Sequence, residues 1–343
     1  MEQAHPRAVE SIRENTIDRV RQRLPHITNL QNFAIFLVVL GHCTPTNNWR
    51  LVPPFMMWLI KVIYSFHLPL FMFISGFLFM YSWRGRSIDY VDFIYKKIKR
   101  LLLPYLVFST LAFLLKNAFS QYAIRKISFT LDSYLAGIFY PEDNPMINLW
   151  FLPTLFIIFL IAPFLKRVIE NGRKAVLSLI LLLILLLNSL KIIQIELLNI
   201  SGAVYFLIFF YLGGIAGRYH EKLIMCKHYA FLAVSLMLLG VTNLIDFRLG
   251  VLAPLVGIAF SYSLSHFLGN SSVRAADYID GYYYQIFLMS WFVQVFIRAF
   301  YRVGMLDYWP TVFLMLFGGL YIPVFVARLV QRKSPELKAV FGM

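Results

Sequence analysis

Long apolar runs separated by short polar connections dominate the sequence. Ten runs are long enough to cross about 30 Å of hydrocarbon, which takes roughly twenty helical residues. They lie near residues 28–46, 62–82, 101–119, 147–165, 175–190, 201–217, 229–245, 249–267, 282–300 and 309–330. A start near Pro53 would lengthen the second run. The pattern predicts an all-α, polytopic membrane helix bundle with about ten transmembrane helices.

Composition agrees with a membrane protein. Hydrophobic residues make up 59% of the 343 residues and charged residues only 14%, which is too apolar for the surface of a water-soluble domain. We divide the chain into a basic amphipathic cytoplasmic leader (1–26), one transmembrane domain (27–331) and a cytoplasmic tail (332–343). For the leader, a helix on the inner leaflet and a disordered basic segment are both open.

The distribution of positive charge predicts the orientation. Lys and Arg are retained on the cytoplasmic side of a membrane. If both termini share a side, that side holds 23 of the 32 Lys and Arg residues, so we expect both termini to be cytoplasmic. Basic cytoplasmic loops next to anionic lipid explain the net charge of +15, and the sequence has no nucleic-acid-binding motif. The expected partner is the lipid bilayer, and not nucleic acid.

Two histidines lie at membrane depth, where an ionisable side chain is a functional-site candidate. His42 ends the first run, and His67 opens the second in the stretch SFHLPLFMFISGFLF. Successive spans run in opposite directions, so both histidines fall near the outer third of the bilayer. We expect them to face one cavity. The alternative is that each histidine is bonded to a neighbouring carbonyl or to interfacial water.

A second polar residue shares the helix face of His42. Gln31 lies eleven positions upstream, which is roughly 16 Å along a helix with an angular offset of about 20°. One polar stripe therefore links the two ends of the first span.

A cluster of cations precedes the third span in IYKKIKRLLLPY, residues 94–105. Lys97 and Arg100 belong to this cluster, and Arg and Lys bind phosphate by charge and donor geometry. The cluster is therefore a candidate mouth for a polyphosphate ligand. Positive-inside anchoring is the alternative explanation.

Six segments in order resemble the membrane acyltransferase 3 family, and the resemblance covers about residues 27–328. The segments are ITNLQNFAIFLVVLGH (27–42), YSFHLPLFMFISGFLF (64–79), KKIKRLLLPY (96–105), NLWFLPTLFIIFLIAPFL (148–165), FFYLGGIAGR (209–218) and YYYQIFLMSWF (282–292). Each alone is a weak apolar pattern, and the order makes the set fairly specific.

The resemblance implies roles for individual residues. The family has an Arg and a His with ten residues between them in the first span, and the His is taken as the catalytic base. His42 stands at the His position and Gln31 at the Arg position. Thr28 and Ser290 replace an Asp and a His that are common in the family. Gln31 cannot supply the missing cation, and Lys97 and Arg100 are the nearest candidates for it.

The resemblance also implies a function. It indicates an O-acyltransferase in the bacterial cytoplasmic (inner) membrane that uses acyl-CoA, most often acetyl-CoA, as donor and an extracytoplasmic glycan as acceptor. His42 would be the general base and His67 would orient the acceptor or bind the oxyanion. Gln31, Lys97 and Arg100 would hold the donor. Envelope polysaccharide assembly proteins are candidate partners, and no metal is expected.

Trp150 and Tyr284 are candidates for stacking on the sugar of the acceptor. Aromatic residues also gather at membrane interfaces without any ligand, so an aromatic belt is the alternative.

Two functions from other classes are also open. One is a polysaccharide exporter or flippase of the same fold without acyl transfer. The other is a non-catalytic scaffold of a glycan assembly complex in which His42 is merely tolerated. Alanine at His42 discriminates among them, because loss of a general base costs about 10²- to 10⁴-fold in rate.

Overall fold

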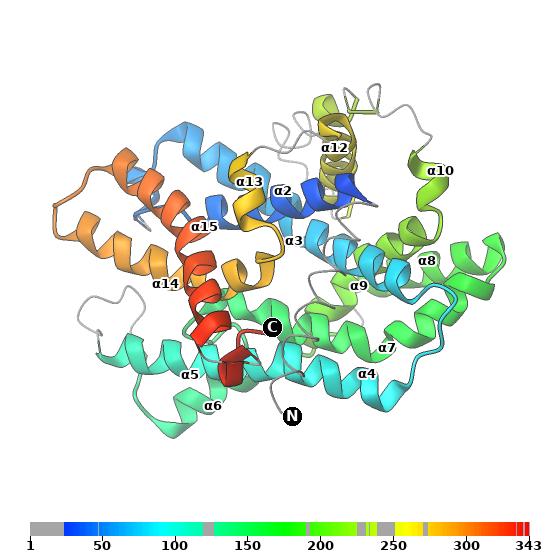
Figure 1. Cartoon of the computed structure of the whole chain (residues 1–343), viewed down its shortest axis with the longest axis horizontal. Helices are drawn as coiled ribbons and strands as arrows, with labels where there is room; N and C mark the ends of the chain where they lie inside the picture. Colours follow the sequence, from blue (N-terminus) through cyan, green and yellow to red (C-terminus); the bar gives the residue numbers. More distant parts are fainter. Residues whose placement is uncertain are drawn as a thin grey trace.

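The computed structural model describes residues 24–46, 48–118, 127–189, 193–224, 231–232, 234–238, 251–269, 274–333, 335–338 and 340–342. Across these residues the chain is all-helical and has no strand (Figure 1). The first half contains α2 (Pro25–Gly41), η1 (Trp49–Leu51), α3 (Pro54–Trp83), α4 (Tyr90–Lys97), η2 (Ile98–Leu102), α5 (Leu103–Ala118), α6 (Leu131–Phe139), η4 (Ile147–Trp150) and α7 (Phe151–Asn171). The second half contains α8 (Lys174–Ser189), η5 (Leu197–Asn199), α9 (Ile200–Arg218), α10 (His220–Ile224), α12 (Leu252–Leu268), α13 (Arg274–Ile279), α14 (Tyr283–Arg302), α15 (Tyr308–Lys333) and η6 (Pro335–Lys338).

Five helical stretches of the described chain are long and apolar enough to cross a membrane. They are Pro54–Trp83, Tyr90–Ala118, Ile147–Asn171, Leu197–Arg218 and Tyr308–Arg332, and two shorter apolar helices cover Val176–Leu187 and Leu252–Leu268. The second predicted run begins at Pro54, as its extension to Pro53 anticipated. The predicted run 229–245 lies largely outside the described residues. The count of ten spans and the orientation of the termini stay predictions.

Helix α3 is held against α9 by glycines that allow the two backbones to touch. A Cβ atom on Gly76 would lie 2.0 Å from the carbonyl oxygen of Phe210, and one on Gly213 would lie 2.0 Å from that of Phe73. Small residues permit this close approach between membrane helices. Because α3 carries His67, this packing fixes the depth and rotation of that histidine.

Helix α2 packs on two groups of helices. It contacts α3 and α12 in one group and α14 and α15 in the other. Figure 1 shows α14 and α15 running side by side at the left of the molecule. Helix α9 extends the first group, since it packs on α3 and in turn carries α7 and α8. The C-terminal end of α2 is thereby placed between α3 and α14.

Pro104 explains a change in helical hydrogen bonding between α4 and α5. Proline has no N–H, so Pro104 cannot donate to the carbonyl of Arg100 four residues earlier. The preceding residues form a π-helical turn, in which the N–H of Leu103 donates to the carbonyl of Ile98. The Arg100 carbonyl accepts a 2.6 Å hydrogen bond from the Tyr284 hydroxyl. The proline thus leaves an acceptor that ties α14 to η2.

The two ends of the chain differ in what the structure describes. The predicted leader lies outside the described residues except for 24–26. At the other end, Phe341 packs its ring on Phe108 of α5 with a centroid distance of 5.8 Å, and its carbonyl accepts a 3.0 Å hydrogen bond from Gln285 of α14. The described end of the tail is therefore packed on the helices.

Candidate functional site

The site begins with the carbonyl groups at the C-terminal end of α2. The last carbonyls of a helix have no partner within it and must bond elsewhere. Gln294 of α14 donates to Val39 O at 2.9 Å, the Tyr64 hydroxyl of α3 donates to Gly41 O at 2.9 Å, and Arg298 Nη2 donates to His42 O at 3.2 Å. A cation at this position also complements the negative end of the helix dipole. Two neighbouring helices thus bind the carbonyl groups around the residue that caps the C-terminal end of α2.

That residue is His42. It caps α2, is half-buried, and its Nδ1 lies 3.2 Å from the Tyr64 hydroxyl oxygen. The two ring centroids are 5.9 Å apart. His42 therefore contacts α3 through its side chain and α14 through its carbonyl.

His67 lies one helical turn beyond Tyr64 on α3 and is buried. Its Nδ1 is 2.8 Å from the Ile63 carbonyl, which can only accept, so Nδ1 carries a proton. In a neutral imidazole the other nitrogen, Nε2, is then an acceptor. The His67 ring stacks on the Tyr64 ring with centroids 5.1 Å apart. The bond to a neighbouring carbonyl, one of the two alternatives expected for His67, is present together with this contact.

Tyr64 therefore lies between the two histidines that the sequence singled out. His42 contacts the phenol hydroxyl and His67 stacks on the ring, so this tyrosine joins the two histidines. The single cavity that they were expected to face stays a prediction. Gly41 makes the arrangement possible, because a Cβ there would meet Cε1 of Tyr64 at 2.9 Å. The group that this glycine admits beside His42 is thus the Tyr64 ring.

Sequence reasoning missed Gln294 and Arg298. Both are polar, lie four residues apart and share one face of α14, a mostly apolar helix. Gln294 is buried and reaches Cys43 Sγ at 3.5 Å as well as Val39. The Nε atom of Arg298 is buried without a hydrogen-bond partner among the described residues. An i, i+4 polar pair in a predicted span was the signal that could have identified them.

Gln31 lies in the second turn of α2 and is half-buried. Its neighbours tie this end of α2 to other helices: Asn29 donates to Gly269 O at 2.8 Å, and Asn32 donates to Asp280 at 2.7 Å. The regular helix between Gln31 and His42 keeps the predicted separation of roughly 16 Å.

Lys97, Arg100 and Tyr284 come together away from His42. The Lys97 ammonium lies 3.6 Å from the ring centroid of Phe159 and 5.2 Å from that of Phe93, a cation–π arrangement. The Arg100 side chain is exposed, and its carbonyl binds Tyr284. Tyr284 is fourteen residues from Arg298 on α14, about 21 Å along the axis. The structure therefore does not bring Tyr284 to the histidines.

Trp150 ends η4 and is half-buried, with its ring 5.4 Å from that of Phe206. The ring of its neighbour Phe151 packs against that of Phe71, which lies one turn beyond His67 on α3, with centroids 6.2 Å apart. Trp150 is thus linked to α3 through Phe151, and among the described residues no direct contact joins it to the histidines.

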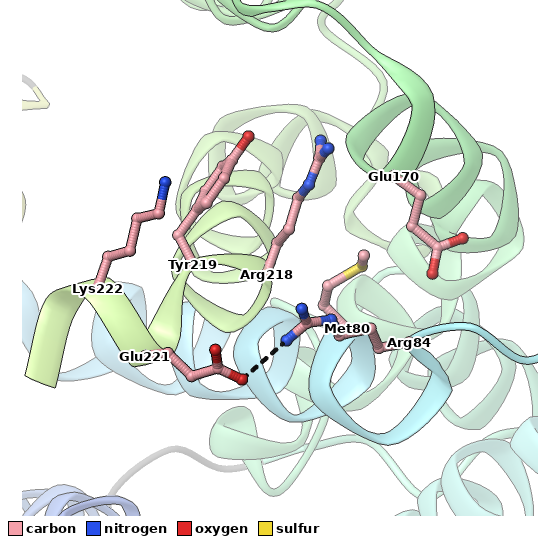
Figure 2. A pocket seen from close by; sticks show the side chains of 7 residues that line it. All are labelled: Met80, Arg84, Glu170, Arg218, Tyr219, Glu221 and Lys222. Carbon is pink, nitrogen blue, oxygen red and sulfur yellow. Dashed lines mark ion pairs between the residues drawn. The ribbon is translucent and has the colours of Figure 1, made fainter.

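A charged cavity lies at the C-terminal end of α3 (Figure 2). It has a volume of about 410 Å³ and is lined by Met80, Arg84, Glu170, Arg218, Tyr219, Glu221 and Lys222. Met80 is thirteen residues beyond His67, about 20 Å along α3. The cavity and the histidines thus lie at two depths of one helix.

The charges in this cavity are unequally paired. Arg84 forms a 3.5 Å ion pair with Glu221, and Glu170 binds Lys166 at 2.6 Å and the Gly85 N–H at 3.0 Å. Arg218 Nη1 is buried and has no hydrogen-bond partner among the described residues. Guanidinium donors of this kind suit phosphate oxygens. Among the described residues, no group of three or more His, Cys, Asp and Glu side chains forms a metal site.

The comparisons with known proteins agree with this bundle of apolar helices. The sequence model of a family described as an acyltransferase domain matches residues 26–328. The chain therefore belongs to the membrane acyltransferase 3 family, as the six segments indicated. No curated protein and no solved structure matches the chain. Family membership supports a multi-pass membrane protein with acyltransferase activity.

Proposed function

We propose that this chain is a membrane O-acyltransferase of the bacterial cytoplasmic membrane. It takes an acyl group, most often acetyl, from acyl-CoA on the cytoplasmic side and passes it to a hydroxyl of an extracytoplasmic glycan. One observation carries the proposal: His42 and His67 flank Tyr64 at the clamped end of α2, and Arg298 adds a positive charge beside them. Envelope polysaccharide assembly proteins would supply or receive the glycan.

His42 is the general base in this proposal. The acceptor hydroxyl oxygen attacks the thioester carbonyl carbon while its proton passes to a ring nitrogen of His42. The carbon–sulfur bond then breaks, the new ester remains on the glycan, and the CoA sulfur leaves as a thiolate that takes the proton from His42. Acyl-CoA and alcohol thus become ester and CoA, with His42 returned to its neutral form.

His67 and Arg298 take different parts. The only proton of neutral His67 is bound to the Ile63 carbonyl, so its Nε2 can accept a hydrogen bond from the acceptor hydroxyl but cannot donate to an oxyanion. This favours orientation of the acceptor over the oxyanion role that was also expected. Arg298 has donors and a fixed charge next to His42, which suits stabilisation of the oxyanion.

The donor reaches His42 from the opposite side of the bundle. The Arg84–Arg218 cavity lies about 20 Å from His67 along α3, a span that an extended pantetheine arm covers. Arg218 is the cation there with an unused buried donor, and it fits a CoA phosphate. Gln31 would line the path, and Lys97 and Arg100 would add positive charge at its entrance. The cation–π packing of Lys97 favours a structural contribution for that residue.

Trp150 remains the candidate for stacking on the acceptor sugar. Tyr284 does not fit that part, because its hydroxyl is bound to Arg100 about 21 Å along α14 from Arg298.

The test measures O-acyl esters on surface polysaccharide purified from host cells and examined by NMR. Cells would carry the wild-type chain, a deletion, His42→Ala or the control Ser65→Ala. Within the described part of the chain, the Ser65 hydroxyl bonds to Val62 O, 2.7 Å away on its own helix. We expect ester to be lost in the deletion and in His42→Ala, with polymer still exported. Unchanged ester with polymer trapped inside the deletion strain would contradict the enzyme and favour the exporter. Unchanged ester and normal export in His42→Ala would favour a scaffold.

A further inference from the structure

The hydroxyl of Tyr64 makes two hydrogen bonds at the end of α2. It lies 2.9 Å from the carbonyl oxygen of Gly41 and 3.2 Å from Nδ1 of His42. Both distances are within hydrogen-bonding range, and the ring is fixed on one side by its stacking contact with His67. The hydroxyl is therefore held between a group that only accepts and one that does either.

A count of protons settles which group donates. The phenol has one proton, and a carbonyl oxygen can only accept, so the bond to Gly41 uses that proton. The hydroxyl oxygen then has only lone pairs for His42. Both bonds exist together only if Nδ1 of His42 carries a proton and donates it to Tyr64. In neutral His42 this leaves Nε2 as the nitrogen with a free lone pair.

We propose that Tyr64 is a positioning residue that fixes His42 as the Nδ1–H tautomer and so presents Nε2 as the base. The catalytic meaning of this inference rests on the proposed function, but the tautomer itself does not. Tyr64 acts through His42, as the third member of a nucleophile–base–orienter set does, and it holds the ring without bringing a carboxylate into the membrane.

The surrounding residues make this arrangement specific to one geometry. Gly41 has no Cβ, and a Cβ there would push against the Tyr64 ring at 2.9 Å. Arg298 holds the carbonyl of His42 from the other side, so the backbone of the histidine cannot swing away from the phenol without losing that bond. The orientation of His42 is thus set at its ring by α3 and at its backbone by α14.

The test reads the tautomer directly. Side-chain ¹⁵N NMR of the full chain in lipid bilayers, labelled at its seven histidines, distinguishes protonated from unprotonated ring nitrogens. Subtraction of the His42→Ala spectrum assigns the His42 signals. We expect Nδ1 protonated and Nε2 unprotonated in the wild type, the same in the control Ser65→Ala, and a shift toward the Nε2–H tautomer in Tyr64→Phe.

Activity gives the second readout. Tyr64→Phe should lower kcat for acyl transfer by about 10- to 100-fold, part of the factor that general-base catalysis supplies, with little change in KM for acetyl-CoA. If Tyr64→Phe does not fold, Gly41→Ala displaces the same ring and should change the tautomer in the same direction.

An Nε2–H tautomer in the wild type, or an unchanged His42 signal in both variants, would overturn the inference. The proposed function fails separately: a Tyr64-dependent Nδ1–H signal with full acyl transfer in His42→Ala would keep the tautomer and remove the base.

Discussion

The middle and the C-terminal end of helix α3 carry two different arrangements of polar groups. In the middle, Tyr64 and His67 donate to backbone carbonyls of α2 and α3, and His42 is bonded to the Tyr64 hydroxyl. At the C-terminal end, Arg84 and Arg218 line an open cavity together with carboxylates. The first arrangement fixes the direction of single atoms, and the second supplies charge over a wider space.

Proton transfer and phosphate binding place different demands on the side chains of an acyltransferase. Proton transfer needs a base within hydrogen-bonding reach and in one orientation, so its side chain must be fixed. Binding of a phosphate tolerates several geometries, because charge and multiple donors act over a longer range. We therefore expect substitutions around His42 and Tyr64 to lower kcat and substitutions at the cavity to raise KM.

The largest expected effect is on the rate. His42→Ala should lower kcat for acyl transfer by about 10²- to 10⁴-fold while KM for acetyl-CoA changes little, because the base acts in the transition state. Steady-state kinetics of the purified protein in lipid nanodiscs measure both constants, with Ser65→Ala as the matched control. A higher KM with an unchanged kcat would move His42 from the chemical step to donor binding.

The next effect is on stability and concerns the α3–α9 contact, which lies between the histidines and the cavity along α3. Gly213→Ala places a Cβ 2.0 Å from a backbone oxygen of α3, and overpacking of this kind costs about 1–3 kcal/mol. In neighbouring Gly214→Ala the nearest atom is the end of the Ile169 side chain at 2.9 Å, which can move, and the Gly76 oxygen lies at an ordinary contact distance of 3.9 Å. In thermal unfolding in detergent, the midpoint temperature of Gly213→Ala should be well below that of Gly214→Ala. Equal midpoints would show that the helices are not in backbone contact there.

A smaller effect is expected at the cavity. Arg218→Gln should raise KM for acetyl-CoA by about 10- to 100-fold with kcat retained, since a charge-assisted hydrogen bond is worth about 1.5–3 kcal/mol. Lys97→Met should raise it less, because the Lys97 ammonium already lies against Phe159. A larger increase in KM for Lys97→Met than for Arg218→Gln would place the donor phosphates at Lys97 and leave Arg218 as a structural residue.

The smallest effects concern two ion pairs of the same spacing in different surroundings. Lys166 is only 7% exposed in its 2.6 Å pair with Glu170, whereas Lys96 is 69% exposed in its 2.6 Å pair with Asp92. Lys166→Ala should lower the free energy of unfolding by about 1–2 kcal/mol, and Lys96→Ala by at most about 0.5 kcal/mol. Thermal unfolding at two salt concentrations checks this prediction. A larger loss of unfolding free energy in Lys96→Ala than in Lys166→Ala would contradict the claim that the buried ion pair contributes more.

The sequence predicted the helical elements because hydrophobic run length is a local property. It also predicted a similar depth for His42 and His67, because counting residues along two adjacent antiparallel spans gives the depth of each. The Tyr64 contact follows from the same two spans, yet tyrosine at an interface is too common to stand out.

What could not be predicted depends on which helices are neighbours. Arg298 and Gln294 reach α2 across more than 250 positions of chain, and run length says nothing about that pairing. The place of Tyr284 depends on Pro104, which leaves the Arg100 carbonyl without its helical donor. The cavity likewise joins the ends of α3, α7 and α9, which are far apart in sequence.

The most direct test of the central claim uses the purified chain in sealed proteoliposomes. Acetyl-CoA labelled in its acetyl group is supplied on the face that carries the Arg218 cavity, and polysaccharide from the deletion strain on the other. We predict labelled ester on the polysaccharide with the wild-type chain and with Ser65→Ala, and its loss with His42→Ala. Equal labelling by His42→Ala would contradict the account, because acyl transfer would then proceed without the histidine around which the site is built.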